Sequence, residues 1–291
     1  MILGVIDIGS HSCRLKIEQR EAGRRTVLRD AMTTTGLMCG LAETGRLSAI
    51  AMEETLTALA AFREALDACR ADAYRVIATS AMREAANGAE FARQIEAVTR
   101  LPVEIISGEE EALLSYAGMR EALPLTENPL LLDVGGGSSE FFCPDVVQLS
   151  LKMGAVRAAE TGLDEKAALR ALEPLMPYRP ALAGCTLVGC GGTITTLAAI
   201  HYAMMVYDPA RVQGTVLTKE EIEAIHGKLA LLSLEERKQV PGLQPKRAPV
   251  IVSGCFWVLQ IMAFLGQSAI TVSDADLREG VLAGLAQQHS V

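Results

Sequence analysis

Aromatic residues and blocks of positive charge are scarce in this sequence, and their scarcity argues against several functions. Only 4% of the 291 residues are aromatic, and the formal net charge is −8. Single-stranded nucleic acids bind aromatic platforms in basic grooves, so this composition disfavours that role, and a membrane-surface role as well. A polyanionic substrate stays open if backbone N–H groups, a few arginines and a divalent cation attract it locally.

Cysteine pairs and long apolar runs are also missing. The seven cysteines form no C-x-x-C pair, which fits small buried residues in a reducing compartment. The longest apolar stretch, residues 250–265, is shorter than the roughly 20 residues that span a bilayer, and it predicts a buried core helix. The N-terminus runs straight into a strand pattern without a basic leader, so we expect a cytoplasmic protein.

Motifs of several other enzyme classes are absent. The sequence contains no G-x-S-x-G elbow, no Walker A loop and no H-E-x-x-H motif. Acyl transfer by a serine triad and hydrolysis by zinc therefore lose support. Phosphoryl transfer, in which positioning and electrostatics do most of the catalysis, remains.

What the sequence does contain is one motif used twice. Each copy consists of an apolar run, an aspartate, glycine and small hydroxyl residues, and the copies are Gly4-Val5-Ile6-Asp7-Ile8-Gly9-Ser10-His11-Ser12 and Leu130-Leu131-Leu132-Asp133-Val134-Gly135-Gly136-Gly137-Ser138-Ser139. Each predicts a buried strand that ends in an acid, followed by a tight turn whose N–H groups can reach an anion. Two copies about a domain apart predict a duplicated fold with a phosphate-metal site.

The remaining pattern predicts an α/β chain of two domains, residues 1–126 and 127–291, with a turn-rich junction between them. Strands are expected at residues 3–7, 14–19, 74–78, 103–106, 140–142, 146–151, 186–190 and 269–272, and helices at 48–70 and 88–99. The order strand, paired glycines, helix at Gly191, Gly192 and Thr193 predicts a further anion site at a helix N-terminus.

Asp7 and Asp133 end the two glycine-motif strands, where α/β folds place ligand groups. A carboxylate there can hold Mg²⁺ directly or through water. The alternative is an aspartate that caps its own turn. The similar flanks of the two acids favour the metal role, and His11 is the histidine that lies inside a glycine turn.

Glutamates and arginines supply further candidates. The three consecutive glutamates 109–111 open a helix, where the dipole favours negative charge. They point about 100° apart, so they cannot all face one site, and their spacing does not say which of them is a candidate general base. Arg83 follows a strand end and is either a phosphate contact or a surface residue. Arg157 and Arg278 leave the same two alternatives.

Taken in order, these motifs resemble the exopolyphosphatase and guanosine pentaphosphate phosphohydrolase (Ppx/GppA) family in its short two-domain form. The resemblance runs nearly end to end and includes the two glycine motifs, Ala78-Thr79-Ser80-Ala81-Met82-Arg83, Ile105-Ile106-Ser107-Gly108-Glu109-Glu110-Glu111-Ala112, Met153-Gly154-Ala155-Val156-Arg157, Gly189-Cys190-Gly191-Gly192-Thr193 and Ser273-Asp274-Ala275-Asp276-Leu277-Arg278-Glu279-Gly280. It implies two actin-like (ribonuclease H-like) ATPase domains with the active site in the cleft between them.

The resemblance also implies roles for individual residues. Glu111 falls where the family's proposed catalytic base lies and would activate the water that attacks the terminal phosphorus. Asp133 and Glu140 match acidic, metal-associated positions, beside the Asp7 expected from the strand pattern, and the implied cofactor is Mg²⁺ or another divalent cation. The expected phosphate-binding residues are Ser10, His11, Ser12, Arg83, Gly135, Gly136, Gly137, Ser138, Gly191, Gly192 and Thr193.

Two substitutions depart from the family pattern: His11 replaces the usual asparagine, and Leu113 stands where arginine is often found. Because a histidine is larger and titrates near neutral pH, the first turn is expected to hold phosphate differently. Both changes bear on substrate choice more than on reaction class.

The expected activity is Mg²⁺-dependent release of terminal orthophosphate from inorganic polyphosphate or guanosine pentaphosphate. The alternatives are a non-catalytic sensor that binds guanosine tetra- or pentaphosphate, and a kinase or ATPase of the same superfamily. No nucleic-acid polymer and no membrane is an expected partner, and the resemblance is compatible with a homodimer.

Overall fold

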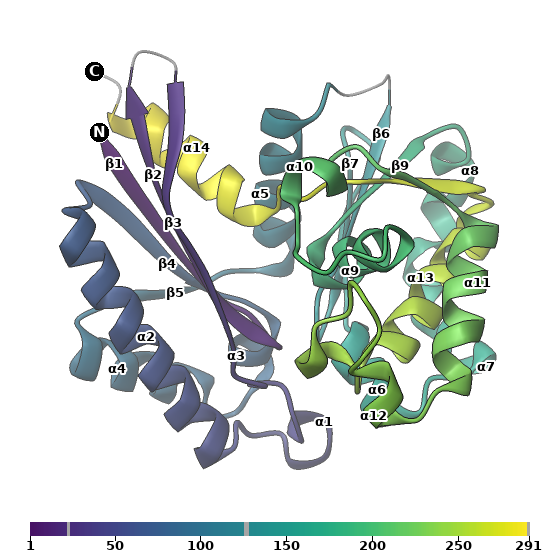
Figure 1. Cartoon of the computed structure of the whole chain (residues 1–291), viewed down its shortest axis with the longest axis horizontal. Coiled ribbons are helices and arrows are strands. Elements are labelled where there is room, and N and C mark those ends of the chain that lie inside the picture. The colour runs from purple at the N-terminus through teal and green to yellow at the C-terminus, as the bar shows by residue number, and fades with distance from the viewer. Residues whose placement is uncertain (22–23, 125–127, 290–291) are drawn as a thin grey trace. The chain divides into compact units, whose positions relative to one another are not determined.

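The computed structural model describes residues 1–21, 24–124 and 128–289 and divides into two compact units (Figure 1). The first unit comprises Met1–Glu121 and Leu277–Val291, and the second comprises Ala122–Asp276. Each unit is built on its own mixed sheet, which confirms the predicted α/β class. The predicted boundary at residues 126 and 127 lies outside the described residues.

The first sheet has the strand order β3-β2-β1-β4-β5. Its strands are β1 (Ile2–Ile8), β2 (Ser12–Glu21), β3 (Arg24–Thr34), β4 (Ala73–Ala78) and β5 (Val103–Ile105). β1 pairs antiparallel with β2 and parallel with β4, and β4 pairs parallel with β5. The carboxyl ends of β1, β4 and β5 therefore meet at one edge of the sheet, where the predicted site residues of this unit follow them.

Helices cover both faces of the first sheet. They are α1 (Leu41–Thr44), α2 (Ala49–Cys69), α3 (Ser80–Glu84), α4 (Gly88–Thr99), α5 (Gly108–Ala122) and α14 (Leu277–His289). Ser48 caps α2 by accepting a hydrogen bond from the Ala51 N–H. Figure 1 shows α2 and α4 on one face of the sheet and α14 on the other.

Helix α14 makes the first unit discontinuous in sequence, which differs from the predicted assignment of residues 127–291 to one domain. Its residues Leu277, Val281 and Leu282 are buried in one cluster with Leu3 and Val5 of β1. This apolar face explains why α14 belongs to the first unit, since separating it from β1 would expose both sides of the cluster to water.

Ion pairs support this docking and account for the motif near the end of the chain. Glu279 pairs with Lys16 of β2, and Arg278 Nη1 lies 3.1 Å from Asp30 Oδ1 of β3. Burial alone lowers the pKa of the Lys16 amine, but the neighbouring Glu279 carboxylate outweighs it and raises that pKa above its usual value. Arg278 was expected either to contact phosphate or to lie at the surface. The structure instead places this side chain in an ion pair that holds α14.

The second sheet has the order β10-β11-β9-β6-β7-β8. Its strands are β6 (Pro129–Val134), β7 (Ser139–Cys143), β8 (Val147–Leu151), β9 (Thr186–Cys190), β10 (Val216–Thr218) and β11 (Ala269–Val272). Without β10, the order and the strand directions repeat those of the first sheet, with β6, β7, β8, β9 and β11 in the places of β1 to β5. The duplication that the glycine motifs predict is therefore confirmed.

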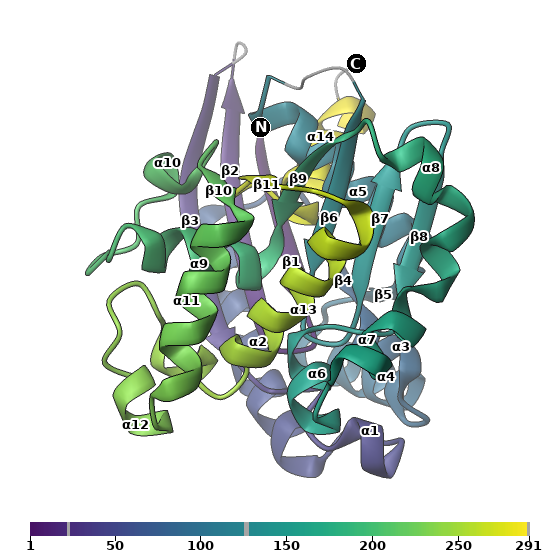
Figure 2. The ribbon, with the colours of Figure 1, turned by 90° about the vertical axis from the view of Figure 1, so that its right-hand side faces the viewer.

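The helices of the second unit surround a large apolar core. They are α6 (Ala155–Thr161), α7 (Glu165–Leu172), η1 (Glu173–Tyr178), α8 (Arg179–Leu182), α9 (Gly191–His201), α10 (Pro209–Val212), α11 (Lys219–Leu231), α12 (Leu234–Arg237), η2 (Pro245–Arg247) and α13 (Ile251–Leu265). Figure 2 shows α9, α11 and α13 in front of the second sheet. Side chains of these helices and of β6 belong to a single buried cluster.

Helix α13 is the buried apolar helix that the sequence predicts. Trp257, at its centre, is fully buried, and its indole N–H donates to the Ser139 hydroxyl of β7 over 2.9 Å. Among the helices in the described ranges, none combines the length and the apolar character needed to cross a membrane.

Candidate active site

The two glycine turns share one hydrogen-bonding pattern. Gly9 N donates to Ser12 O over 3.1 Å, and Gly135 N donates to Ser138 O over the same distance. Each turn joins a central strand to an antiparallel neighbour, β1 to β2 and β6 to β7. The motif that repeats in the sequence therefore repeats as a three-dimensional element.

The carbonyl groups of the second turn face helix α6. Gly135 O accepts from the N–H of Ala155, and Gly136 O accepts from those of Val156 and Arg157, over 2.8 to 3.2 Å. Because C=O and the following N–H point in opposite directions in a trans peptide, the N–H groups that follow these carbonyls, at residues 136 and 137, turn away from α6. Adjacent N–H groups in a turn are the kind of group that binds anions, and these two are directed away from the helix.

Residues 153–157 hold this turn in place. A Cβ on Gly154 would lie 2.6 Å from Gly135 O, so a residue without a side chain is needed at this close approach. Arg157 Nε donates to Gly137 O over 3.0 Å. Arg157 was expected either to contact phosphate or to lie at the surface. Its bond to Gly137 O gives it a third role, because this bond orders the glycine turn.

The first turn is held by a different segment in the same manner. His11 O accepts from the N–H of Thr35 and Gly36, and Ser10 O accepts from that of Met38. The buried Ser10 hydroxyl also accepts from the N–H of Ala81 at the start of α3, over 3.2 Å. Ser10 thus ties the first turn to the helix that carries Arg83.

Across each turn, the strand acid faces a different partner. Asp133 is paired directly with Glu140 on β7, whereas Asp7 is paired with Arg14 on β2. Directly opposed residues of antiparallel strands lie on one face of the sheet, where like charges repel and opposite charges attract. Glu140 is fully buried, and its Oε1 accepts from the Ser150 hydroxyl of β8 over 2.7 Å. The register therefore places two carboxylates opposite each other in the second unit, and a carboxylate opposite a guanidinium in the first.

Arg14 was missed by the sequence reasoning, although a signal for it was present. In both motifs the opposed residue follows the aspartate by seven positions. If each motif is treated as a hairpin, the residue seven positions after the aspartate lies opposite it. This rule identifies Arg14 in the first motif and Glu140 in the second.

Gly191 and Gly192 bring the start of helix α9 against two charged side chains. Gly191 has φ +84°, and a Cβ there would lie 2.4 Å from Asp133 Oδ1. A Cβ on Gly192 would lie 2.1 Å from Nη2 of Arg247. A carboxylate and a guanidinium thus both lie at the α9 N-terminus, where the helix dipole carries partial positive charge. Arg247 was also missed, since only its basic neighbour Lys246 distinguishes it in the sequence.

Glu111 is the inward-facing member of the three glutamates 109–111. Glu109 is exposed, and Glu110 is paired with Arg75, whereas Glu111 is buried. Arg83 Nη1 lies 3.1 Å from Glu111 Oε2 and 2.8 Å from Ile106 O. The helix geometry therefore selects the glutamate that the family resemblance also selects, and it places Arg83 beside it.

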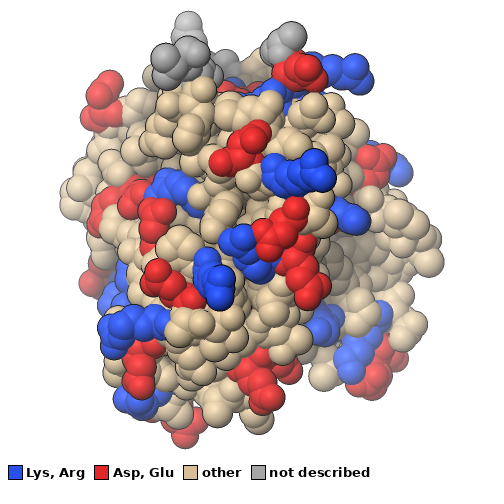
Figure 3. Space-filling view, turned by 90° about the vertical axis from the view of Figure 1, so that its left-hand side faces the viewer, with Lys and Arg blue, Asp and Glu red and all other residues tan. Residues whose placement is uncertain are grey.

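The predicted residues fall into one set in each unit. The first set is Asp7, Ser10, His11, Ser12, Arg83 and Glu111, and the second is Asp133, Gly135, Gly136, Gly137, Ser138, Glu140, Gly191, Gly192 and Thr193. Within the described ranges, three or more His, Cys, Asp or Glu side chains do not group closely enough to hold a metal by themselves. On the face drawn in Figure 3, positive and negative side chains are intermixed, so this face has no extended basic surface for a polyanion.

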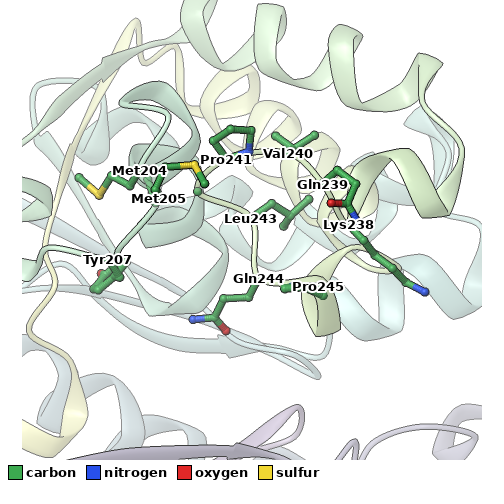
Figure 4. A pocket seen from close by; sticks show the side chains of 12 residues that line it. Met204, Met205, Tyr207, Lys238, Gln239, Val240, Pro241, Leu243, Gln244 and Pro245 are labelled. Atoms are coloured by element: carbon green, nitrogen blue, oxygen red, sulfur yellow. The ribbon is translucent and has the colours of Figure 1, made fainter.

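A pocket of about 330 Å³ lies beside the opposite half of α9 (Figure 4). It is lined by Ala199, by Met204, Met205 and Tyr207, and by the facing segment of residues 238–245. Ala199 is eight residues beyond Gly191, which corresponds to about 12 Å along the helix. The expected phosphate-binding residues therefore lie outside this pocket.

The fold and the site together define a two-unit α/β protein with duplicated glycine turns beside buried carboxylates. Residues 16–289 match the Ppx/GppA phosphatase family. The chain belongs to this family of hydrolases, which confirms the resemblance drawn from its motifs.

Solved structures of similar proteins cover nearly the whole chain. An Aquifex aeolicus member of the Ppx/GppA family is 31% identical, with a TM-score of 0.79, over 100% of this chain and 99% of that one. An exopolyphosphatase from Cytophaga hutchinsonii is 26% identical, with a TM-score of 0.88, over 99% and 98% of the two chains.

A curated relative is longer. The bifunctional 3-dehydroquinate synthase/phosphatase of Fusobacterium nucleatum subsp. nucleatum is 29% identical over 307 residues. The match covers 95% of this chain but only 45% of that protein, so the chain spans about half the length of this relative.

Proposed function

We propose that this chain is a Mg²⁺-dependent phosphohydrolase that releases terminal orthophosphate from inorganic polyphosphate or guanosine pentaphosphate. The observation that carries the proposal is the buried Glu111 carboxylate, paired with Arg83 in a unit that also presents a glycine turn. The similarity to an exopolyphosphatase supports the reaction class.

Phosphate oxygens would be held mainly by backbone N–H groups. In the second unit these are the N–H groups of Gly136 and Gly137, turned away from α6, and those at the start of α9 beside Arg247. In the first unit the turn at residues 10–12 offers N–H groups and hydroxyls. Such fixed dipoles need no high net positive charge, which reconciles a polyanionic substrate with a chain of net charge −8.

The donor set of the second unit fits Mg²⁺. Mg²⁺ takes oxygen ligands, keeps several waters and is commonly held by one or two carboxylates together with substrate phosphates. Asp133 and Glu140 are both buried and directly opposed, so they are the residues that would hold a divalent cation, and its charge would offset their repulsion. Asp7 has Arg14 opposite it, which makes it the weaker candidate ligand. When bound, the ion would neutralise charge that develops on the phosphate oxygens.

Glu111 would act as the general base. A substrate phosphate that draws Arg83 into a bidentate contact would leave the Glu111 carboxylate available to a water molecule. Glu111 would take a proton from this water as its oxygen bonds to the terminal phosphorus and the bridging P–O bond breaks. The products are orthophosphate and a chain one phosphate shorter.

The test is phosphate release from polyphosphate of defined lengths and from guanosine pentaphosphate, with and without Mg²⁺. Glu111→Gln keeps the shape of the side chain and removes its basicity, so release should fall about 100-fold or more. Glu109→Gln is the matched control, because it makes the same change two residues earlier on the same helix at an exposed position.

The possible results distinguish a phosphohydrolase from a sensor and from a kinase. Metal-dependent release that is lost in Glu111→Gln and kept in Glu109→Gln supports the proposal and ranks the substrates. Equal release by the two variants removes Glu111 from the mechanism. Tight binding of guanosine pentaphosphate without turnover would instead indicate a sensor, and phosphate transfer from ATP to an acceptor would indicate a kinase.

A further inference from the structure

Two thiols lie close together at the end of the second sheet that is remote from the glycine turn. Cys143 ends β7, and Cys185 immediately precedes β9. Their Sγ atoms are 3.7 Å apart, and both residues are buried, with 4% and 8% of their surfaces exposed. The two cysteines are 42 positions apart in the sequence, so a search for closely spaced cysteines such as C-x-x-C does not detect this pair.

A pocket gives access to this pair. Its volume is about 380 Å³, and both cysteines line it together with Pro129, Pro144 and Gly184. A small oxidant such as hydrogen peroxide is much smaller than this volume. The thiols are therefore shielded by the fold but border a space that a small molecule can enter.

Forming a disulfide here requires only a local movement. An S–S bond is about 2.05 Å long, so the two sulfur atoms must approach by about 1.7 Å. Cys143 is held by the ladder between β7 and β8, where it pairs with Val147. Cys185 lies in a bend after Gly184, and a Cβ built on Gly184 meets no atom of the described residues within 4 Å. The backbone of Cys185 is held, because its N–H donates to Leu182 O and its C=O accepts from Gln267 Nε2, each over 3.1 Å, so the approach of the two sulfur atoms falls to the side chains.

We propose that Cys143 and Cys185 form a hydroperoxide-oxidisable dithiol, a modification site distinct from the phosphate-handling residues. The Cys185 sulfur attacks one peroxide oxygen, the O–O bond breaks, and sulfenic acid and one water form. The Cys143 sulfur then attacks the sulfenic sulfur, the S–S bond forms, and the S–O bond breaks to release a second water. Two thiols are oxidised by two electrons in total, and one peroxide is reduced to two waters.

The order of attack follows from the environment of Cys143. Burial, the hydrogen bond to Cys185 and the nearby Asp145 carboxylate raise the pKa of the Cys143 thiol to about 12. Cys185 is also the more exposed of the two, at 8% against 4%, and lies in a bend and not in a strand ladder, so peroxide reaches Cys185 first. Cys143 then acts as the resolving thiol.

The experiment uses the full chain with Cys39→Ser, since Cys39 is exposed and would otherwise link two chains. The protein is treated with hydrogen peroxide, unfolded in denaturant so that buried thiols become accessible, alkylated and mapped by mass spectrometry. We expect a loss of two hydrogen atoms, two fewer alkylated thiols, a cross-linked peptide joining Cys143 to Cys185, and recovery of both thiols with dithiothreitol. Cys255, buried in the core with its thiol directed at Ile222 O, is the internal reference that should stay alkylatable.

Single variants test the order of the steps. In Cys143→Ser, Cys185 should accumulate as a sulfenic acid that dimedone traps, whereas in Cys185→Ser the Cys143 thiol should remain alkylatable. Both thiols remaining intact in the parent protein while peroxide is consumed, or oxidation of Cys255 to the same extent, would overturn the proposal. The decisive peptide map comes from the Cys39→Ser chain with Cys143 and Cys185 intact. A Cys143 or Cys185 variant that fails to fold therefore does not prevent the test.

Discussion

Replacing Gly191 by alanine tests whether the start of α9 positions the Asp133 carboxylate. Gly191 has φ +84°, and a left-handed conformation costs a residue with a side chain about 1–2 kcal/mol. The added Cβ would also lie 2.4 Å from Asp133 Oδ1, closer than atoms can remain, so the carboxylate must move by about 1 Å to restore ordinary contact. A displacement of this size in a catalytic group can cost about 100-fold in rate.

Gly266→Ala provides the matched control. Gly266 has φ +70°, and a Cβ there meets no atom of the described part of the chain within 4 Å, so this variant carries a similar backbone cost without disturbing a site residue. Urea unfolding should show both variants destabilised by about 1–2 kcal/mol, with Gly191→Ala the more destabilised. Mg²⁺-dependent phosphate release should fall about 100-fold in Gly191→Ala and stay near that of the parent in Gly266→Ala. Equal release by the two variants would refute the link between Gly191, Asp133 and activity.

Two further substitutions test smaller interactions. Ser150→Ala removes the hydrogen bond to the buried Glu140 Oε1 and should destabilise the protein by about 1–3 kcal/mol, measured by urea unfolding. If Glu140 binds Mg²⁺, adding the ion should recover part of this lost stability. The same loss with and without Mg²⁺ would count against that role. The hydrogen bond from the Thr218 backbone N–H lowers the pKa of Glu221 below its ordinary value of 4.5. The capping carboxylate therefore stabilises the fold above pH 4.5 and ceases to do so as the pH falls through its lower folded-state pKa. The difference in urea midpoint between the parent and Glu221→Gln should accordingly shrink in acid, and a difference that grows there would contradict this.

The sequence predicted the strands and the main helices well because their signals are local. Hydrophobic runs ending at glycine or at capping residues marked β9 (Thr186–Cys190), β11 (Ala269–Val272) and α4 (Gly88–Thr99) at the bounds the structure has. The duplicated turn was equally visible, since the demand for small residues at a tight turn acts at the same positions in both copies.

Features that depend on tertiary contact were not predicted. Arg14 and Arg247 are single arginines without a motif of their own, and only strand register and the packing of η2 on α9 place them beside the expected site residues. Residues 153–157 were recognised as a family motif, but their bonds to the carbonyls of the second turn could not be read from spacing. The grouping of α14 with the first unit was missed for the same reason, because apolar periodicity shows that a helix has a buried face but not which sheet covers it.

The discontinuity of the first unit has a consequence for how the protein is made. Residues 122–276 form the second unit as one uninterrupted stretch, so all of its strands are available once that stretch has left the ribosome. The first unit begins to emerge earlier, yet one face of β1 stays uncovered until Leu277, Val281 and Leu282 are synthesised. Domains generally fold as units during synthesis, so we expect the second unit to mature before the first, reversing the order in which their sequences begin.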